Sequence, residues 1–206
     1  MALVPKPSPR RTGRPHASSR AMLEEAAGEL FLERGFAATS VADITQRTGI
    51  SRSTFFNYFP AKSDLLWAAF DDRVTALRAA LAAAPGTGLP AEAHPTVAVV
   101  TGDALRALVA DLPAEHVALA FIQADAMGLG DDLRLAAARR TADVGMVLAG
   151  YALARGVDPL RARVAGTAWA GALIAAVEAW AHAGASRTRL PALLDRALEP
   201  VRGAWG

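Results

Sequence analysis

Helical periodicity, interrupted by glycine and proline, is the feature that most constrains what this chain can fold into. Apolar residues recur with helical spacing near the start, at Met22, Leu23, Ala26, Ala27, Leu30 and Phe31. A long helix is predicted from about Lys62 to Ala84, and further helices at about 95–111, 113–127, 131–155, 158–184 and 188–203. Alanine and leucine dominate these segments, and both favour helix. No alternating run of useful length is present, so the predicted fold is all-α.

Residues 40–59 predict two short helices joined by a tight turn. Ser40 and Asp43 have the spacing of a capping box, in which each side chain accepts a hydrogen bond from a free backbone N–H. Gly49 is expected to end the first of these helices, and Ser51 can cap the second. The small core between them and the preceding helix is expected to hold Ala42, Ile44, Ile50, Phe55 and Phe59.

This spacing is typical of a DNA-binding helix-turn-helix, whose second helix enters the major groove. The outward residues of that helix would be Arg52, Ser53, Phe56, Asn57 and Tyr58. Arginine can bond guanine through two donors, asparagine can bond adenine, and phenylalanine can contact the thymine methyl group. Tyrosine and lysine can bond phosphate oxygens. The alternative at this stage is an ordinary helical hairpin in an α-helical core.

A resemblance to a known family favours the DNA-binding interpretation. The matching positions are Leu30-Phe31-(x)3-Gly35-Phe36-(x)2-Thr39-Ser40-Val41-(x)2-Ile44 and Gly49-Ile50-Ser51-(x)2-Thr54-Phe55-Phe56-Asn57-Tyr58-Phe59-Pro60-x-Lys62-(x)2-Leu65. This pattern closely resembles the N-terminal domain of the TetR family of repressors, over about residues 17–77. The resemblance implies a sequence-specific DNA-binding transcriptional regulator, a repressor released from its operator by a small molecule.

The resemblance also implies roles for individual residues. Thr39 and Ser40 match phosphate contacts at the start of the second helix. Further contacts to the DNA backbone match Thr54, Tyr58 and Lys62. Positions near base edges match Arg52, Ser53, Phe56 and Asn57. Many family members have tyrosine where this chain has Phe56 and glycine where it has Ser53, so a phosphate-bonding hydroxyl is missing at Phe56.

The net positive charge of the chain lies at its front. Residues 1–62 hold nine basic and five acidic residues, whereas the remainder holds 13 basic and 15 acidic ones. Residues 1–17 contain four prolines, which oppose a helix, and the basic residues Lys6, Arg10, Arg11 and Arg14. We expect this basic arm, including Arg14, to reach the minor groove of DNA. A solvated tail is the alternative.

Composition and motifs exclude several other functions. The chain has no cysteine, and its four histidines are far apart, so we expect no metal site. No nucleophile, zinc-protease or phosphate-loop motif is found, so we expect neither an enzyme nor a cofactor. Residues 164–177 are apolar but too short to span a membrane, and the basic N-terminus lacks the apolar region of a secretion signal. We therefore expect a cytoplasmic protein without a membrane partner.

The predicted domains are a flexible basic arm over residues 1–17, a DNA-binding domain over 18–62 and a helical regulatory and dimerisation domain over 63–206. The long helix from about Lys62 follows the recognition helix directly, so it can act as a lever between the two domains. A largely apolar effector is expected in a pocket lined by Leu66, Trp67, Phe70, His116, Phe121, Gln123, Val147 and Tyr151. Packing and pairing within the core is the alternative for these residues.

Small residues in the helix predicted at 158–184 allow close approach of a symmetric partner, at Gly166, Ala170, Gly171, Ala175 and Ala179. With the helix predicted at 188–203, this favours a homodimer joined by a four-helix contact. The double-stranded DNA operator of such a dimer should be a near-palindrome. An α-helical enzyme and an all-α adaptor that binds another protein are the alternatives, and binding to genomic DNA would separate the regulator from both.

Overall fold

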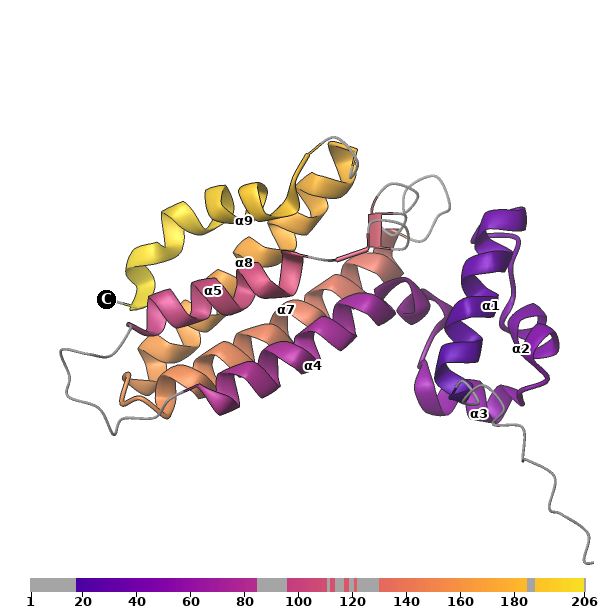
Figure 1. Cartoon of the computed structure of the whole chain (residues 1–206), viewed down its shortest axis with the longest axis horizontal. Coiled ribbons are helices and arrows are strands. Elements are labelled where there is room, and N and C mark those ends of the chain that lie inside the picture. Colours follow the sequence, from indigo (N-terminus) through magenta and orange to yellow (C-terminus); the bar gives the residue numbers. More distant parts are fainter. Residues whose placement is uncertain are drawn as a thin grey trace, which may run out of the picture. The chain divides into compact units, whose positions relative to one another are not determined.

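The computed structural model describes residues 18–84, 96–110, 112–113, 117–118, 121, 130–184 and 188–205. All regular structure within these residues is helical, which confirms the predicted all-α class (Figure 1). The chain divides into two compact units, Met1–Tyr58 and Phe59–Gly206. This division precedes the predicted boundary after residue 62, so residues 59–62 group with the second unit.

The first unit contains three helices, α1 (Ser19–Arg34), α2 (Val41–Thr48) and α3 (Arg52–Tyr58). Capping residues hold the ends of these helices, among them the predicted Gly49. The Ser18 side chain accepts a hydrogen bond from the backbone N–H of Ala21 at 3.3 Å and so caps α1. Gly49 ends α2 with a φ of 71°, a left-handed conformation that glycine adopts without steric cost.

The core of the first unit differs in part from the prediction. Ile44 and Phe55 are fully buried, as expected. Ala42, however, is exposed, and Thr45 is buried instead. The inward face of α2 is thus turned toward Thr45, whose hydroxyl donates to the carbonyl oxygen of Ala42 at 3.0 Å. This hydrogen bond gives the Thr45 hydroxyl an acceptor inside the protein. Ile50 is half-buried.

The helices of the second unit follow one another as η1 (Lys62–Trp67, a 3-10 helix), α4 (Ala68–Ala83), α5 (Val97–Ala110), α7 (Gly130–Leu153), α8 (Pro159–His182), α9 (Leu190–Leu198) and η3 (Glu199–Trp205, a 3-10 helix). The long helix predicted from Lys62 therefore begins with a 3-10 segment before continuing as α4. Within the helix predicted at 113–127, the described residues 117–118 and 121 are helical.

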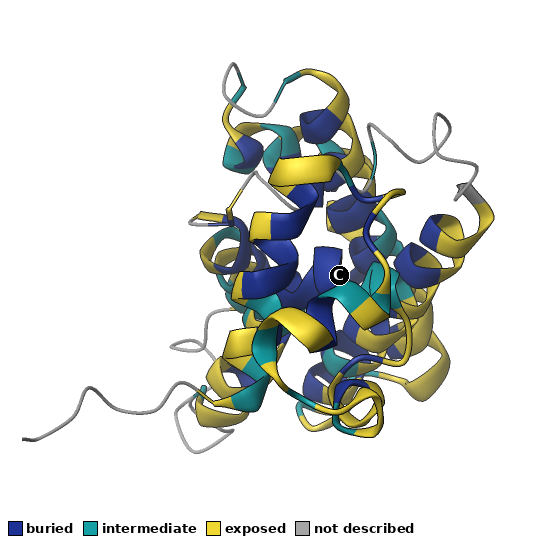
Figure 2. Cartoon of the chain, turned by 90° about the vertical axis from the view of Figure 1, so that its right-hand side faces the viewer, coloured by how far each residue is buried: buried dark blue, intermediate teal, exposed yellow. Residues whose placement is uncertain are grey.

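Buried residues lie on the inward faces of the helices and exposed residues on their outer faces (Figure 2). Helix α8 lies between α7 on one side and α9 with η3 on the other (Figure 1). Its apolar stripe is buried, at Trp169, Leu173, Val177 and Trp180. The indole N–H of Trp169 donates to the carbonyl oxygen of Val201 at 2.9 Å, and that of Trp180 to Thr188 at 3.0 Å. By length and composition α8 could cross a membrane, but 56% of its most apolar window is buried inside the protein, as in a core helix.

Helix α9 packs its apolar side chains against its own chain. Leu190, Leu194 and Leu198 are all at most 3% exposed, and α9 contacts α8 and α5. The helix ends at Leu198, and Pro200, which cannot donate a backbone hydrogen bond, lies in the 3-10 segment that follows. These leucines are therefore buried within the chain, whereas Ala175 and Ala179, two of the small residues expected to contact a second copy, are exposed.

Candidate nucleic-acid interface

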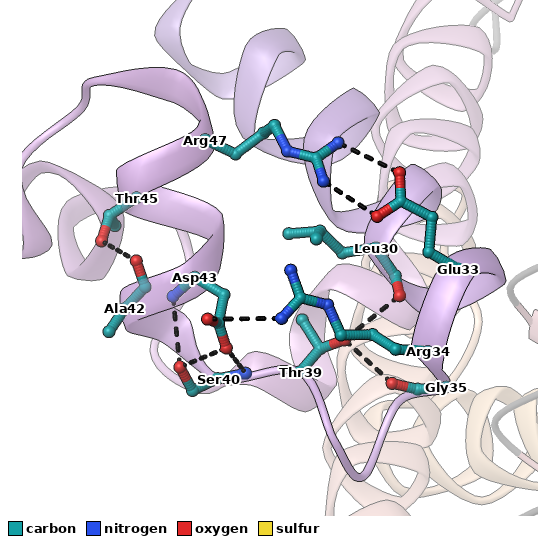
Figure 3. A network of polar contacts seen from close by, with 10 residues as sticks. All are labelled: Leu30, Glu33, Arg34, Gly35, Thr39, Ser40, Ala42, Asp43, Thr45 and Arg47. Carbon is teal, nitrogen blue, oxygen red and sulfur yellow. Dashed lines mark hydrogen bonds and ion pairs between the residues drawn. The ribbon is translucent and has the colours of Figure 1, made fainter.

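The start of α2 is held by the predicted capping box (Figure 3). The backbone N–H of Ser40 donates to the Asp43 carboxylate at 2.8 Å, and the backbone N–H of Asp43 donates to the Ser40 hydroxyl oxygen at 3.1 Å. Arg34 of α1 approaches the same carboxylate at 3.5 Å. The first turn of α2 is therefore fixed both within itself and to the end of α1, while Ser40 stays exposed.

Thr39 does not fit the phosphate contact that the family resemblance implies. Its side chain is only 1% exposed, and its hydroxyl donates to the carbonyl oxygens of Gly35 at 2.8 Å and Leu30 at 3.2 Å (Figure 3). The Thr39 hydroxyl thus bonds to carbonyl oxygens at the C-terminal end of α1, because a buried hydroxyl needs an acceptor inside the protein. This corrects the role expected for Thr39, which is structural.

A second polar contact fixes α2 against α1 (Figure 3). The Arg47 guanidinium donates to both carboxylate oxygens of Glu33, at 3.2 and 2.9 Å, and to Glu29 at 3.1 Å. The hydrogen bond from Arg47 lowers the pKa of the Glu33 carboxyl, which favours its charged form. Because these groups are solvent-exposed, the contact orients the two helices more than it stabilises them.

Helix α3 has one buried anchor and a polar outward face. Phe55 is fully buried, whereas the neighbouring Phe56 is 47% exposed and meets the Phe55 ring edge-on at 5.3 Å between ring centroids. The other exposed residues of α3 are Arg52, Ser53, Asn57 and Tyr58. At its start, the Ser51 hydroxyl oxygen accepts from the backbone N–H of Thr54 at 3.1 Å, which confirms the predicted cap. The residues predicted to contact bases therefore share one solvent-facing surface.

Three further residues are predicted to contact DNA but do not belong to the exposed face of α3. The Thr54 hydroxyl is half-buried and lies 2.8 Å from that of Ser51. Lys62 opens η1 in the second unit and is half-buried. Arg14 and the rest of the arm lie outside the described residues. Contacts of all three with DNA remain predictions.

The residues predicted to bind an effector fall into two places in the second unit. Leu66, Trp67 and Phe70 are fully buried at the start of the lever, and Trp67 meets Phe70 and Phe121 edge-on, at centroid distances of 5.6 and 5.4 Å. These aromatic side chains form a continuous cluster. The indole N–H of Trp67 is buried and has no hydrogen-bond partner among the described residues.

Two other predicted effector residues, Val147 and Tyr151, lie along a groove in the second unit. Val147 and Tyr151 line a separate groove of about 430 Å³ between α4 and α7, together with Leu81 and the cations Arg78 and Arg155. Leu66, Trp67, Phe70 and Phe121 do not line that groove. The single pocket lined by all eight residues stays a prediction. His116 and Gln123 lie outside the described residues.

Sequence reasoning missed a buried arginine beside the aromatic cluster. Arg140 of α7 lies with its guanidinium carbon 4.8 Å from the centre of the Trp67 ring, and the residue is 7% exposed. It is in helical register with the buried Ala136 and Val144, so a charge within an apolar stripe could have identified it. Within the described ranges, no group of three His, Cys, Asp or Glu side chains could hold a metal ion.

Comparison with known proteins places the first unit among bacterial regulators. Residues 23–69 match the family model described as bacterial regulatory proteins, tetR family. The chain is 42% identical over 66 residues to the HTH-type transcriptional regulator EthR of Mycobacterium tuberculosis, and 33% identical over 75 residues to the regulator MftR of the same species. These matches cover 32% and 36% of this chain, and only 31% and 38% of the relatives' own length.

Solved structures resemble the chain over most of its length. The crystal structure of Thermus thermophilus FadR, a TetR-family repressor in complex with lauroyl-CoA, covers 88% of this chain and 92% of its own, at 24% identity and a TM-score of 0.58. FadR of Bacillus halodurans, a fatty acid degradation regulator, covers 92% of this chain and 97% of its own, at 16% identity and a TM-score of 0.51. At these identities the likeness shows a shared fold.

Proposed function

Because the chain belongs to the TetR family of transcriptional regulators through its N-terminal domain, we propose that it is a repressor that a small, largely apolar effector releases from a near-palindromic operator. The outward face of α3 carries the proposal. Arg52 and Asn57 are exposed there and can bond guanine and adenine edges, and Phe56 can pack against a thymine methyl group. Ser40, Tyr58 and Lys62 would bond phosphate oxygens.

Selection from random double-stranded DNA tests the DNA-binding part of this proposal. The expected product is a near-palindrome whose half-sites have centres about 10 base pairs apart, because a symmetric dimer places two recognition helices in adjacent major grooves. Failure to enrich any sequence, together with no shift of genomic fragments, would favour an adaptor that binds another protein. As a regulator that binds genomic DNA, the protein would act in the cytoplasm of a bacterial cell.

The proposed dimer uses the outer face of α7 and α8. Large apolar side chains are exposed on these two helices, Leu135, Met146 and Leu153 on α7 and Leu160 and Val164 on α8. A groove of about 640 Å³ runs between the two helices and is lined by Met146, Leu153 and small residues including Ala142. Exposed apolar side chains that gather on one face are typical of an interface. A second copy fits because a two-fold axis would bring the same face against itself.

The proposed effector contact is the aromatic cluster of Trp67, Phe70 and Phe121. The buried Trp67 indole N–H has no acceptor among the described residues, and a bound carbonyl or other acceptor would supply one. We expect an effector with an apolar body and one acceptor placed at the Trp67 indole. Since the cluster lies at the start of the lever, occupation there would act on the segment that follows α3.

A paired screen tests this effector site. Apolar metabolites are tested together for a change in tryptophan fluorescence and for release of the selected duplex. Trp67→Phe keeps an aromatic ring but removes the N–H, so it should weaken the response to an effector that carries an acceptor. Trp180→Phe is the matched control, since the Trp180 indole N–H already donates to Thr188. Equal responses of both variants would exclude the Trp67 contact.

A further inference from the structure

Arg140 joins helix α7 to the segment that follows the recognition helix. Its Nε and Nη2 donate to the two carboxylate oxygens of Asp71 at 2.8 and 2.6 Å, a two-bond contact that only arginine can form. Nη2 also donates to Asp64 at 3.2 Å, and Nη1 donates to the carbonyl oxygen of Ala136 at 3.1 Å. The Arg140 side chain is only 9% exposed.

The contacts of Arg140 converge on one short stretch of chain. Asp64 lies in η1, Asp71 lies in the first turn of α4, and the Trp67 ring between them lies under the guanidinium at 4.8 Å. Three side chains within eight residues therefore share one partner on α7. Such a partly buried set of ion pairs contributes little net stability compared with apolar packing, but it can specify a single arrangement of the elements that it joins.

Asp64 extends this arrangement to the end of the recognition helix. One of its carboxylate oxygens accepts from Arg140, and the other accepts from the backbone N–H of Ala61 at 3.0 Å. Ala61 precedes η1 and is separated from Tyr58, the last residue of α3, by two residues. A single carboxylate thus connects α7 to the backbone just after α3.

We propose that Arg140 is a positioning residue for operator binding. It does not touch DNA; it holds Asp64, Trp67 and Asp71 in one arrangement and so fixes the conformation of the segment through which the chain leaves α3. This inference rests on the proposed function of the chain as an operator-binding regulator. It also places the Arg140 contacts beside the aromatic cluster, where an effector would disturb them.

A matched control is available in the same unit. Arg106 of α5 donates to Asp195 of α9 at 2.8 Å and to Asp103 at 2.9 Å. This arginine also joins two helices through carboxylates, but neither helix is adjacent to α3 in the chain. Arg106→Met therefore removes an interhelical ion pair, although a more exposed one, without altering the segment that follows the recognition helix.

The test compares Arg140→Met with Arg106→Met in the full-length protein. The duplex selected by the wild-type protein is the specific probe, and a scrambled duplex is the non-specific one. Arg140→Met should lose affinity for the selected duplex by about tenfold or more, with a change of about twofold or less for the scrambled duplex. Hydrogen–deuterium exchange of a peptide that covers residues 59–67 should become faster in this variant. Arg106→Met should alter neither measurement.

The possible results separate this inference from the proposed function. If the wild-type protein selects a duplex and folded Arg140→Met binds it as tightly, the inference is overturned while the proposed function stands. If the wild-type protein selects none, both fall. If Arg140→Met fails to fold, Asp64→Asn is tested in its place. Asparagine keeps the shape of the side chain but removes the charge that pairs with Arg140. A lower specific affinity of folded Asp64→Asn supports the inference, and unchanged affinity overturns it.

Discussion

Gly145 and Gly166 bring the backbones of α7 and α8 into close contact. A Cβ atom at Gly166 would come within 2.6 Å of the Gly145 carbonyl oxygen and 3.0 Å of the Ala149 backbone nitrogen. Backbone atoms cannot move aside as a flexible side chain can, so the helices would have to separate. We expect Gly166→Ala to lower the free energy of unfolding by about 1–3 kcal/mol, measured by chemical denaturation.

The matched control for this change is Gly171→Ala in the same helix. A Cβ atom there would meet nothing within 4 Å. Alanine is favoured over glycine in a helix interior by about 0.5–1 kcal/mol, so this variant should be at least as stable as the wild-type protein. Equal effects of the two substitutions would show that close packing at Gly166 does not matter.

The structural role of Thr39 gives a second prediction. Thr39→Val keeps the shape but removes the hydroxyl that donates to Leu30 and Gly35. We expect a loss of about 1–3 kcal/mol in the free energy of unfolding, because two buried carbonyl oxygens lose a donor. Thr39→Ser keeps the hydroxyl and should lose less. The dependence of DNA affinity on salt concentration should not change in Thr39→Val. A shallower dependence in a variant of unchanged stability would show that Thr39 does contact phosphate.

The basic arm is expected to bind additional DNA phosphates, through residues outside the described ranges. Removing residues 1–14 deletes Lys6, Arg10, Arg11 and Arg14. The slope of log affinity against log salt concentration should become shallower by about 0.9 for each phosphate that the arm neutralises in the wild-type complex. Titrations at several salt concentrations measure this slope. An unchanged slope would leave the arm in solvent and assign all DNA binding to the folded domain.

The proposed dimer face gives a fourth prediction. Val164→Arg places a charge among the exposed apolar side chains of α7 and α8, where Val164 is 59% exposed. Light scattering after gel filtration should show monomers that bind the selected duplex weakly. Leu32→Arg is the control, because Leu32 is 88% exposed on α1 and lies outside this face. A dimer that persists in Val164→Arg would place the interface elsewhere.

Local patterns predicted the front of the chain well. The Ser40–Asp43 capping box, the Ser51 cap and the glycines at 35 and 49 depend on neighbours within a few residues, and the structure contains each of them. Thr39 shows the limit of a family resemblance. Its hydroxyl is committed to carbonyl oxygens four and nine residues away, and a matching position does not reveal that burial.

The second unit was less predictable because its contacts join residues far apart in the chain. Periodicity identified Trp67 and Tyr151 as inward residues but could not show that they lie in different places. Arg140 reaches Asp71 and Asp64 across 69 and 76 residues. Of the small residues assigned to a partner chain, Gly166 and Ala170 are buried within their own chain, Gly171 is half-buried, and Ala175 and Ala179 are exposed. Small size indicates close packing without identifying what packs there.

The central claim is that α3 reads the operator sequence, and Arg52→Ala and Asn57→Ala test it most directly. Each protein is titrated with the selected duplex and with a scrambled duplex at one salt concentration. If the side chains contact bases, each variant should lose about 1–3 kcal/mol on the selected duplex and less on the scrambled one. Equal losses on both duplexes would contradict sequence-specific recognition by these residues and would mean that they contact phosphates only.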